Sequence, residues 1–278
     1  MRTKFSGSSS RNRNRWTTFE TGRFSREKSD GPFVTDRQER VPGFCQNALA
    51  NCRLGFVGAG GINGPIARNE VRKGVGESYI MDHDIVELSN LNRQLFYEKD
   101  IGKSKAICLA KNLIHEGTTG TKVHAIGKHF QDVEQSGLLL CPDGRPIIDI
   151  LICGVDNSMA RIATAYFGLK HNIPVIISAV SGTASHGYVF VQKPGKACFV
   201  CLFPFEMEDY AEPCPVTPAV LDILSVMSGL ATFAVDSLIM QRPRGWDVRM
   251  IYLDGNQMDW NGRVPKRDGC PLCGSLMR

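Results

Sequence analysis

The sequence predicts an α/β fold, a doubly wound and mostly parallel sheet with an antiparallel extension near the C-terminus. Apolar strand-like runs alternate with helical patterns from residue 53 onward, which is the order of successive βαβ units. Two of these runs, 147–153 and 173–180, are apolar almost throughout. Such strands are typical of the centre of a parallel sheet with helices on both faces. The third observation is a glycine-rich turn directly after the first strand.

The stretch 53–84 predicts a strand, a glycine turn, a helix and a second strand. The first apolar run ends at Gly58, Gly60 and Gly61, and apolar residues with helical spacing follow at once. This arrangement directs backbone N–H groups and a helix N-terminus toward an anion, usually a phosphate. The second strand ends at Asp82, where a carboxylate can accept hydrogen bonds from a ribose. We therefore expect a Rossmann-like nucleotide site.

The glycine turn departs from the strict dinucleotide fingerprint, G-x-G-x-x-G. Its sixth position is Asn63, and Gly64 comes one residue late. A glycine-rich turn alone is a weak signal, because a tight strand-to-helix turn without any ligand has a similar sequence. A turn without a ligand is therefore one alternative, and an NAD-dependent oxidoreductase is another.

The remaining elements follow from the same patterns. The expected strands are 53–57, 78–81, 122–126, 147–153, 173–180, 187–192 and 248–253. The expected helices begin at about residue 62 and then cover 103–115, 158–171 and part of 216–240. The last of these segments is long and apolar, but Asp222 and Asp236 interrupt it, so we expect a buried core or interface helix and no membrane span.

The excess of positive over negative charge lies at the beginning of the chain. The net charge is +5, and residues 1–40 hold ten Lys or Arg against five Asp or Glu, which leaves 23 of each sign in the remainder. Residues 1–32 are rich in Ser, Arg and Asn and lack an apolar period, so we interpret them as a basic, disordered arm. Charge in such an arm is weak support for a nucleic-acid partner. No apolar run follows the charged start, which argues against a signal peptide.

Size and composition are sufficient for one large domain. The chain has 278 residues, of which 42% are apolar, so neither a metal nor a disulfide is needed to build its core. We expect this domain over 33–278, with a nucleotide-binding half at about 53–180 and a C-terminal part at about 181–278. Ten cysteines without a secretion signal favour a reducing, cytoplasmic compartment.

Four of the cysteines form two CxxC pairs, Cys198 with Cys201 and Cys270 with Cys273. Four thiolates can close a tetrahedral structural zinc site, which leaves no open position for water. The alternative is two redox-active or incidental pairs. We expect a zinc knuckle that ties the C-terminus to a segment far back in the chain.

Polar residues follow several of the expected strands and helix starts. Arg93 and Lys105 come after the second strand, and Asp156 follows the apolar run 147–153. Taken singly, each could be a surface ion-pair residue, a solvated residue of a first helical turn or a residue near an N-cap. Together they are the set that phosphoryl chemistry needs, because two cations can hold phosphates and a carboxylate can hold magnesium.

Five segments, in this order and spacing, resemble the adenylation domain of the ThiF/MoeB/HesA and ubiquitin-activating family. They are GAGGIN (58–63), the acid Asp82, LSNLNRQ (88–94), IGKSKA (101–106) and GVDN (154–157). The resemblance extends over 33–278. It implies ATP-dependent activation of the C-terminal glycine of a ubiquitin-like or sulfur-carrier protein, which forms an acyl-adenylate and releases pyrophosphate.

The resemblance also assigns roles to residues. Asp82 would hold the ribose, Arg93, Gln94 and Lys105 the triphosphate, and Asp156 a magnesium ion. The full set of nucleotide-binding residues that it implies is Gly58, Gly60, Gly61, Asp82, Asn90, Arg93, Gln94, Lys105 and Asp156.

Two further residues are assigned less directly. Arg37 stands where the family has an arginine that reaches across a homodimer into the partner's site. Cys214 lies between two prolines, in a segment that resembles the loop where relatives carry an acyl-accepting cysteine. A thioester on Cys214 would pass the acyl group to a conjugating enzyme, whereas sulfur transfer would involve a sulfurtransferase; a plain loop cysteine is the alternative.

Three other functions stay open at this point. A tRNA-modifying dehydratase belongs to the same superfamily, and the basic arm could suit RNA. A non-catalytic scaffold could dock a carrier protein while another protein does the chemistry. An NAD-dependent oxidoreductase would share the first βαβ unit but leaves Arg93, Lys105, Asp156 and the cysteine pairs unexplained.

Overall fold

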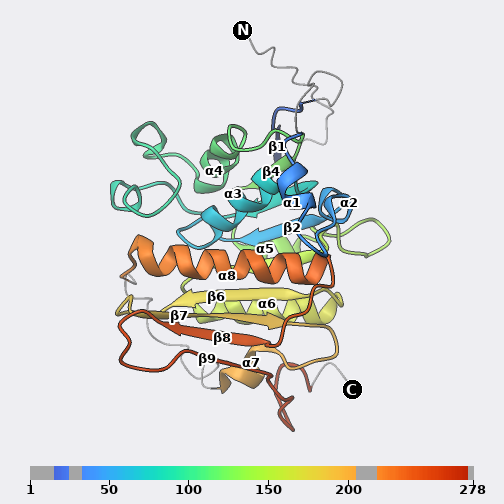
Figure 1. The fold of residues 1–278 in the computed structure, drawn as a ribbon, viewed down its shortest axis with the longest axis vertical. Helices are drawn as coiled ribbons and strands as arrows, with labels where there is room; N and C mark the ends of the chain where they lie inside the picture. Colours follow the sequence, from blue (N-terminus) through green and yellow to red (C-terminus); the bar gives the residue numbers. More distant parts are fainter. Residues whose placement is uncertain (1–15, 25–32, 205–217, 275–278) are drawn as a thin grey trace.

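The structure is a computed structural model that describes residues 16–24, 33–204 and 218–274. Within these ranges one nine-stranded sheet runs through the molecule, and helices lie on both of its faces (Figure 1). The strands are β1 (Thr17–Glu20), β2 (Arg53–Val57), β3 (Glu77–Met81), β4 (Lys122–Ile126), β5 (Ile150–Cys153), β6 (Val175–Val180), β7 (His186–Gln192), β8 (Val248–Tyr252) and β9 (Trp260–Gly262). The α-helices are α1 (Asp36–Glu39), α2 (Gln46–Ala50), α3 (Asn63–Lys73), α4 (Lys105–Leu113), α5 (Phe130–Gln135), α6 (Ser158–Lys170), α7 (Phe199–Leu202) and α8 (Leu221–Ile239).

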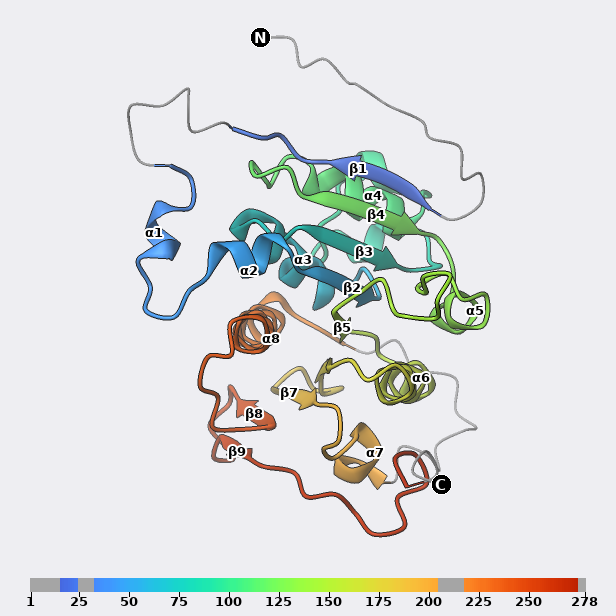
Figure 2. The ribbon, with the colours of Figure 1, turned by 90° about the vertical axis from the view of Figure 1, so that its right-hand side faces the viewer.

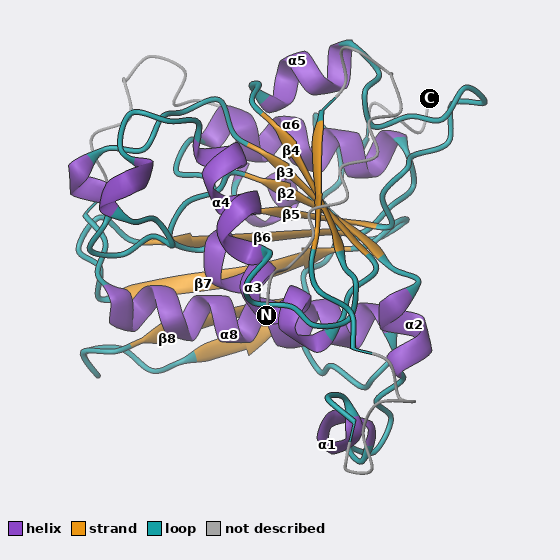
Figure 3. Cartoon of the chain, turned by 90° about the horizontal axis from the view of Figure 1, so that it is seen from above, coloured by secondary structure: helices purple, strands orange, loops and turns teal. Residues whose placement is uncertain are grey.

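The strand order is β1-β4-β3-β2-β5-β6-β7-β8-β9. The five strands from β4 to β6 are parallel, and β7, β8 and β9 continue the sheet in antiparallel fashion. Figure 3 shows the strands fanning out with the twist expected of such a sheet. The chain order reverses between β2 and β5, which is the switch point where doubly wound sheets bind ligands. The predicted α/β sheet with its antiparallel extension is therefore confirmed.

The beginning of the chain departs from the prediction of a disordered arm. In residues 16–24, β1 pairs with β4 in antiparallel fashion, with Thr17 opposite Ala125 and Glu20 opposite Lys122. The Trp16 ring lies edge-on to Tyr79, with their centroids 5.5 Å apart. The prediction is wrong here because a short run of β-formers and aromatics is hidden among charged residues. The other parts of the predicted arm, 1–15 and 25–32, lie outside the described residues.

Two separate apolar cores lie on the two faces of the sheet. Figure 2 shows α3 and α8 on one side and α5, α6 and α7 on the other. Side chains of β2 alternate between the cores, since Leu54 and Phe56 join one and Val57 joins the other. β5 does the same with Ile152 and Cys153. Both central strands are thus buried on both faces, as their unbroken apolar sequences predict.

Helix α8 packs across β6, β7 and α3. Among the described helices, it alone is long and apolar enough to cross a bilayer by length and composition, and 50% of its most apolar window is buried in the fold. The buried half confirms the expected core helix. The outer side of α8 exposes Leu221, Val226 and Phe233, together with Asp222 and Ser225.

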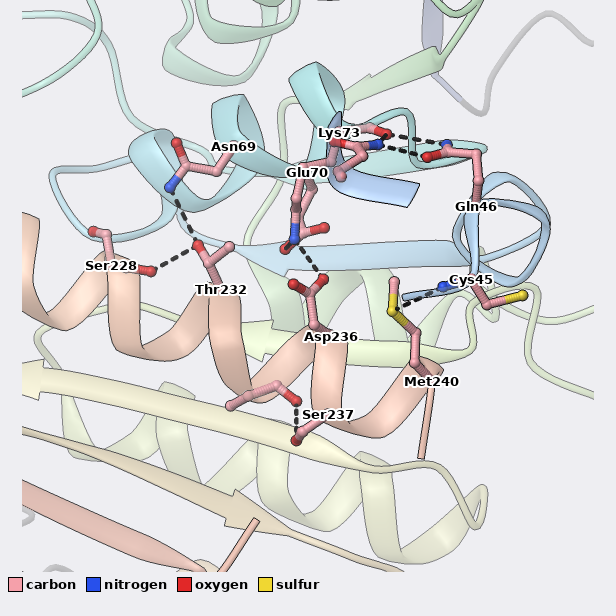
Figure 4. Close-up of polar contacts among 12 residues, drawn as sticks. Cys45, Gln46, Asn69, Glu70, Lys73, Ser228, Thr232, Asp236, Ser237 and Met240 are labelled. Carbon is pink, nitrogen blue, oxygen red and sulfur yellow. Dashed lines mark hydrogen bonds and ion pairs between the residues drawn. The ribbon is translucent and has the colours of Figure 1, made fainter. Parts of the chain in front are cut away.

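The contact between α3 and α8 is partly ionic (Figure 4). The ammonium of Lys73 on α3 bridges the carboxylates of Glu70, at 2.9 Å, and of Asp236 on α8. Closer to the N-terminus of α3, the Asn69 amide donates to the Thr232 hydroxyl at 3.2 Å. Glu70 is fully buried, and burial raises its pKa to about 7, against the opposing effect of Lys73. The carboxyl is therefore more easily protonated in the folded chain than in the unfolded one.

We expect Glu70→Gln to abolish the part of the pH dependence of unfolding free energy that comes from titration of Glu70. Because folding raises the pKa of Glu70, its contribution is complete below the unfolded pKa, near 4.5, and is lost as the pH rises through about 7. The free energy of unfolding of the wild type should therefore fall by roughly 3 kcal/mol relative to Glu70→Gln between pH 4.5 and 8. Urea unfolding at several pH values measures this. Glu98→Gln, at an exposed position, is the control, and equal pH profiles for wild type and Glu70→Gln would contradict the prediction.

Candidate functional site

A cavity of about 350 Å³ opens at the carboxyl ends of the parallel strands, at the switch point between β2 and β5. Eight of the nine predicted nucleotide-binding residues line it: Gly58, Gly60, Gly61, Asp82, Arg93, Gln94, Lys105 and Asp156. These residues come from segments up to about a hundred positions apart in the sequence, and the topology of the sheet brings them together.

The glycine turn forms the floor of the cavity. Gly58 has a φ of +94°, a conformation that favours glycine, and its N–H donates to the carbonyl of Met81 at 2.8 Å. Gly61 allows a close approach, because a Cβ there would lie 2.8 Å from the Leu224 side chain of α8. The turn is thus held between β3 and α8, with the N-terminus of α3 directed at the cavity.

Asp82 links the glycine turn to the end of β3. One carboxylate oxygen accepts from the N–H of Ala59 at 2.7 Å, and the other accepts from the N–H of Asp84 at 2.8 Å. Burial raises the pKa of Asp82, and these two backbone donors and Lys105 oppose the rise. The carboxylate is oriented at the cavity wall, where a ribose hydroxyl can donate to it.

The two predicted phosphate-binding cations are both oriented by neighbouring oxygens. The Lys105 ammonium, at the start of α4, lies 2.9 Å from the carboxylate of Asp84 and is only 12% exposed. The Arg93 guanidinium donates to the carbonyl of Ser89 at 2.6 Å and to the Asn92 side chain at 3.0 Å. Each cation retains donors for a phosphate, because an ammonium has three and a guanidinium five.

Asn90 does not line the cavity, in contrast to the prediction. Its side chain accepts from the N–H of Glu87 at 3.0 Å, and its carbonyl accepts from the N–H groups of Arg93 and Gln94 at 3.2 and 2.9 Å. Asn90 lies within the motif LSNLNRQ (88–94), and the resemblance assigned it to the nucleotide. In the structure Asn90 instead builds the turn that presents Arg93 and Gln94.

Asp156 lines the cavity from the loop after β5. The N-cap of α6 is its neighbour Asn157, whose side chain accepts from the N–H of Ala160 at 2.7 Å. The alternative role of Asp156 as a helix cap is therefore taken by Asn157. Asp156 is an exposed residue that lines the same cavity as Arg93 and Lys105.

The sequence analysis missed several residues that line the cavity. They are His83, Asp84, Lys128, His129 and Arg161. His83 and His129 stack with their ring centroids 3.4 Å apart, because the ends of β3 and β4 are adjacent. A useful signal was available, since His83, Asp84, Lys128 and His129 follow strand ends closely. Their pairing could not be predicted without the order of the strands.

Arg37 does not line this cavity. Arg37 is an exposed residue of α1, and its neighbour Gln38 donates to the carbonyl of Lys73 at the C-terminal end of α3. The glycine turn precedes the other end of α3, an 11-residue helix about 16 Å long. Arg37 is thus distant from the cavity of its own chain. Cys214 lies outside the described residues, so its thioester role stays a prediction.

The four CxxC cysteines meet as predicted. Their sulfur atoms all lie within 4.8 Å of one another, and all four residues are buried. The separations are 3.7 Å from Cys198 to Cys201, 3.5 Å from Cys198 to Cys270 and 3.6 Å from Cys201 to Cys273. Burial raises the pKa of Cys198 and, to about 11, that of Cys273. The cluster is compatible with a zinc ion.

The fold and the cavity together are those of a nucleotide-binding α/β protein. Basic side chains, carboxylates and a glycine turn line one cavity that can accept an anion. The chain belongs to the ThiF family, and the family model matches residues 34–272. The resemblance drawn from the motifs is thereby confirmed over most of the chain.

Similar proteins are named as activating enzymes and adenylyltransferases. The SAMP-activating enzyme E1 of Haloferax volcanii is 29% identical over 234 residues, which cover 82% of this chain and 83% of that protein. The sulfur carrier protein ThiS adenylyltransferase of Bacillus subtilis is 26% identical and covers 92% of this chain and 72% of its own length. Ubiquitin-like modifier-activating enzyme 5 of Culex quinquefasciatus is 32% identical over 161 residues, but the chain spans only 40% of that protein.

Solved structures confirm the fold. The crystal structure of E. coli MccB with ATP superimposes with a TM-score of 0.69 over 89% of this chain and 75% of that one, at 20% identity.

Proposed function

We propose that this protein activates a ubiquitin-like or sulfur-carrier protein by ATP-dependent adenylation of its C-terminal glycine. The observation that carries the proposal is the convergence of Arg93, Lys105 and Asp156 on one cavity floored by the glycine turn. The names of the relatives from Haloferax volcanii and Bacillus subtilis support it, since one is a SAMP-activating enzyme and the other a ThiS adenylyltransferase.

The side chains of the cavity have distinct tasks in this reaction. Asp82 accepts from the ribose, while Arg93 and Lys105 bind the phosphates and stabilise the charge that develops as pyrophosphate leaves. A carboxylate oxygen of the carrier attacks the α-phosphorus, the bond to the bridging oxygen of pyrophosphate breaks, and an acyl-adenylate forms. Asp156 would hold magnesium, which neutralises charge on the phosphates. Lys105 exchanges its contact with Asp84 for one with a phosphate.

Exchange of labelled pyrophosphate into ATP tests this function. We expect exchange only in the presence of a small carrier protein that ends in glycine. Each such protein encoded in the same genome is to be tested separately. Asp156→Ala should lower the rate by at least about a hundredfold, because the magnesium ion that would neutralise the departing phosphates loses its carboxylate ligand. Asp143→Ala, which removes an exposed carboxylate that pairs with Arg145 outside the cavity, should leave the rate unchanged.

Full exchange activity in Asp156→Ala would refute the assignment of this carboxylate. Exchange that depends on tRNA and on no carrier protein would favour the tRNA-modifying dehydratase instead. Binding of NAD but not ATP in calorimetry would favour an oxidoreductase.

The cysteine cluster belongs to the proposal as a structural zinc site. A tetrahedral ion with Zn–S bonds of about 2.3 Å requires sulfur separations of about 3.8 Å, close to the observed 3.5–3.7 Å. The N–H of Arg267 lies 3.5 Å from the sulfur of Cys201, a contact typical of the surroundings of metal thiolates. Zinc here would tie α7 to the C-terminal segment, since the two pairs are 72 residues apart.

We expect one zinc ion per chain in the purified protein, measured by elemental analysis. Cys270→Ser should reduce the zinc content and lower the midpoint of thermal unfolding by several degrees, because binding energy of a structural metal is also folding energy. Cys141→Ser changes a partly exposed cysteine outside the cluster and should alter neither quantity. A stable, metal-free protein would contradict a structural zinc site.

A homodimer that shares residues between sites is the third part of the proposal. Arg37 is remote from the cavity of its own chain, and α8 exposes the apolar side chains of Leu221, Val226 and Phe233, which a second copy would cover. The partner's α1 would then bring a guanidinium to the triphosphate.

Mixed dimers test whether the site is shared. Arg37→Ala and Asp156→Ala should each be inactive alone, but co-expression with two different tags should restore about a quarter of wild-type activity. The reason is that half of the dimers are mixed and each mixed dimer has one complete site. A monomeric protein, or an Arg37→Ala variant with normal activity, would contradict this arrangement.

A further inference from the structure

Asn63 is the residue at which the glycine turn departs from the strict dinucleotide fingerprint, and the structure gives it a specific role. It is the first residue of α3, and its side chain is fully buried. The side-chain NH₂ group donates to the carbonyl of Val57 at 2.7 Å, to that of Gly58 at 3.0 Å and to that of Ile152 at 3.4 Å. One amide therefore contacts three backbone oxygens.

These oxygens belong to both sides of the switch point. Val57 ends β2 and Gly58 begins the glycine turn, whereas Ile152 lies on the neighbouring strand β5. The chain leaves β5 through Gly154, whose N–H donates to the carbonyl of Val57 at 3.2 Å, and reaches Asp156 two residues later. Asn63 thus connects the floor of the cavity with the loop that carries Asp156.

The fit of Asn63 against this loop is also steric. A Cβ at Gly154 would lie 2.5 Å from the side-chain oxygen of Asn63 and 3.2 Å from the Cβ of Ile62. That oxygen has no hydrogen-bond partner in the described part of the chain. A buried acceptor without a partner lowers stability. The hydrogen bonds donated by the NH₂ group of Asn63 must therefore be what holds the side chain in this orientation.

We propose that Asn63 is a positioning residue for adenylation, whose amide sets the distance between the phosphate-binding glycine turn and the carboxylate of Asp156. The inference rests on the proposed function. The hydrogen bonds that orient Asp82, Arg93 and Lys105 do not involve Asn63. We therefore expect the nucleotide to remain bound when the Asn63 amide is lost. What changes is the placement of the loop whose Asp156 would hold magnesium.

Two measurements distinguish this role from simple filling of space. In pyrophosphate exchange, Asn63→Ala should lower kcat by about 100-fold with little change in the KM for ATP, because a misplacement of about 1 Å has this effect on a reacting group. In calorimetry of ATP binding, which needs no carrier, the magnesium concentration for half-maximal binding should rise at least about tenfold, as is typical when a residue that supports a metal ligand is lost.

Asn63→Asp is the discriminating variant, because it keeps the shape of the side chain and replaces the donor by an oxygen. A residue that only fills space would tolerate this change, whereas we expect a loss of kcat at least as large as in Asn63→Ala at pH 8. Asn69→Ala is the control, since Asn69 is also a partly buried amide of α3 but contacts Thr232 away from the cavity. Should Asn63→Ala fail to fold, Asn63→Gly restores the fingerprint glycine and takes its place in both measurements.

A double-mutant cycle tests the contact with Gly154 directly. Gly154→Ala alone should be strongly impaired by the contact with the Asn63 oxygen, and Asn63→Gly should relieve most of that effect. The double variant should therefore retain more activity than the product of the two single effects. Independent effects would overturn the proposed contact.

The outcomes separate the inference from the proposed function. If the wild type neither binds ATP nor exchanges pyrophosphate, the proposed function fails. If the wild type does both and Asn63→Ala and Asn63→Asp keep the wild-type kcat and magnesium dependence, the inference alone is wrong.

Discussion

The pairing of β2 with β5 is the constraint on which the site depends. These neighbouring parallel strands end side by side, with Val57 opposite Cys153, but the helices that follow them cross to opposite faces of the sheet. α3 covers one face and α6 the other (Figure 2), and residues at the N-termini of both helices line the cavity, which is the crevice expected at this point of the sheet. The glycine turn and the loop that carries Asp156 both line this crevice. Residues that follow the strands at this edge line the cavity, together with Lys105 of α4 and Leu224 of α8.

α8 connects the stability of the fold with the geometry of the crevice. The hydroxyl of Ser228 donates to the carbonyl of Ile62 at 3.0 Å, and Leu224 packs against Gly61. The turn that faces the nucleotide is therefore backed by the same helix that binds the buried Glu70 and Lys73 pair through Asp236. A change in the seating of α8 would displace the floor of the site, so the polar contacts between α3 and α8 serve both roles.

Much of the fold, and the position of the site, could be predicted from the sequence because buried strands and glycine turns have strong local signatures. The strands 53–57 and 122–126 were predicted with their observed bounds. The strand predicted over 147–153 begins too early, because the observed strand starts at Ile150 and the preceding Asp149 pairs with Arg53. β1 was missed because its four residues carry no periodic signal. The stacking of His83 on His129 depends on which strands are neighbours, and no local pattern contains that information.

The charges around the cavity bear on the proposed metal and the proposed dimer. Arg93, Lys105, Lys128 and Arg161 face Asp82, Asp84 and Asp156, which leaves one net positive charge. Lys105 and Asp84 already neutralise each other across 2.9 Å. A triphosphate brings more negative charge than this balance can absorb, and the charge shifts further onto pyrophosphate as the bond breaks. Additional positive charge would stabilise the transition state of the proposed reaction. In the proposal, magnesium on Asp156 would supply one such charge and an arginine from a second copy another, so the proposed metal and the proposed dimer answer the same electrostatic need.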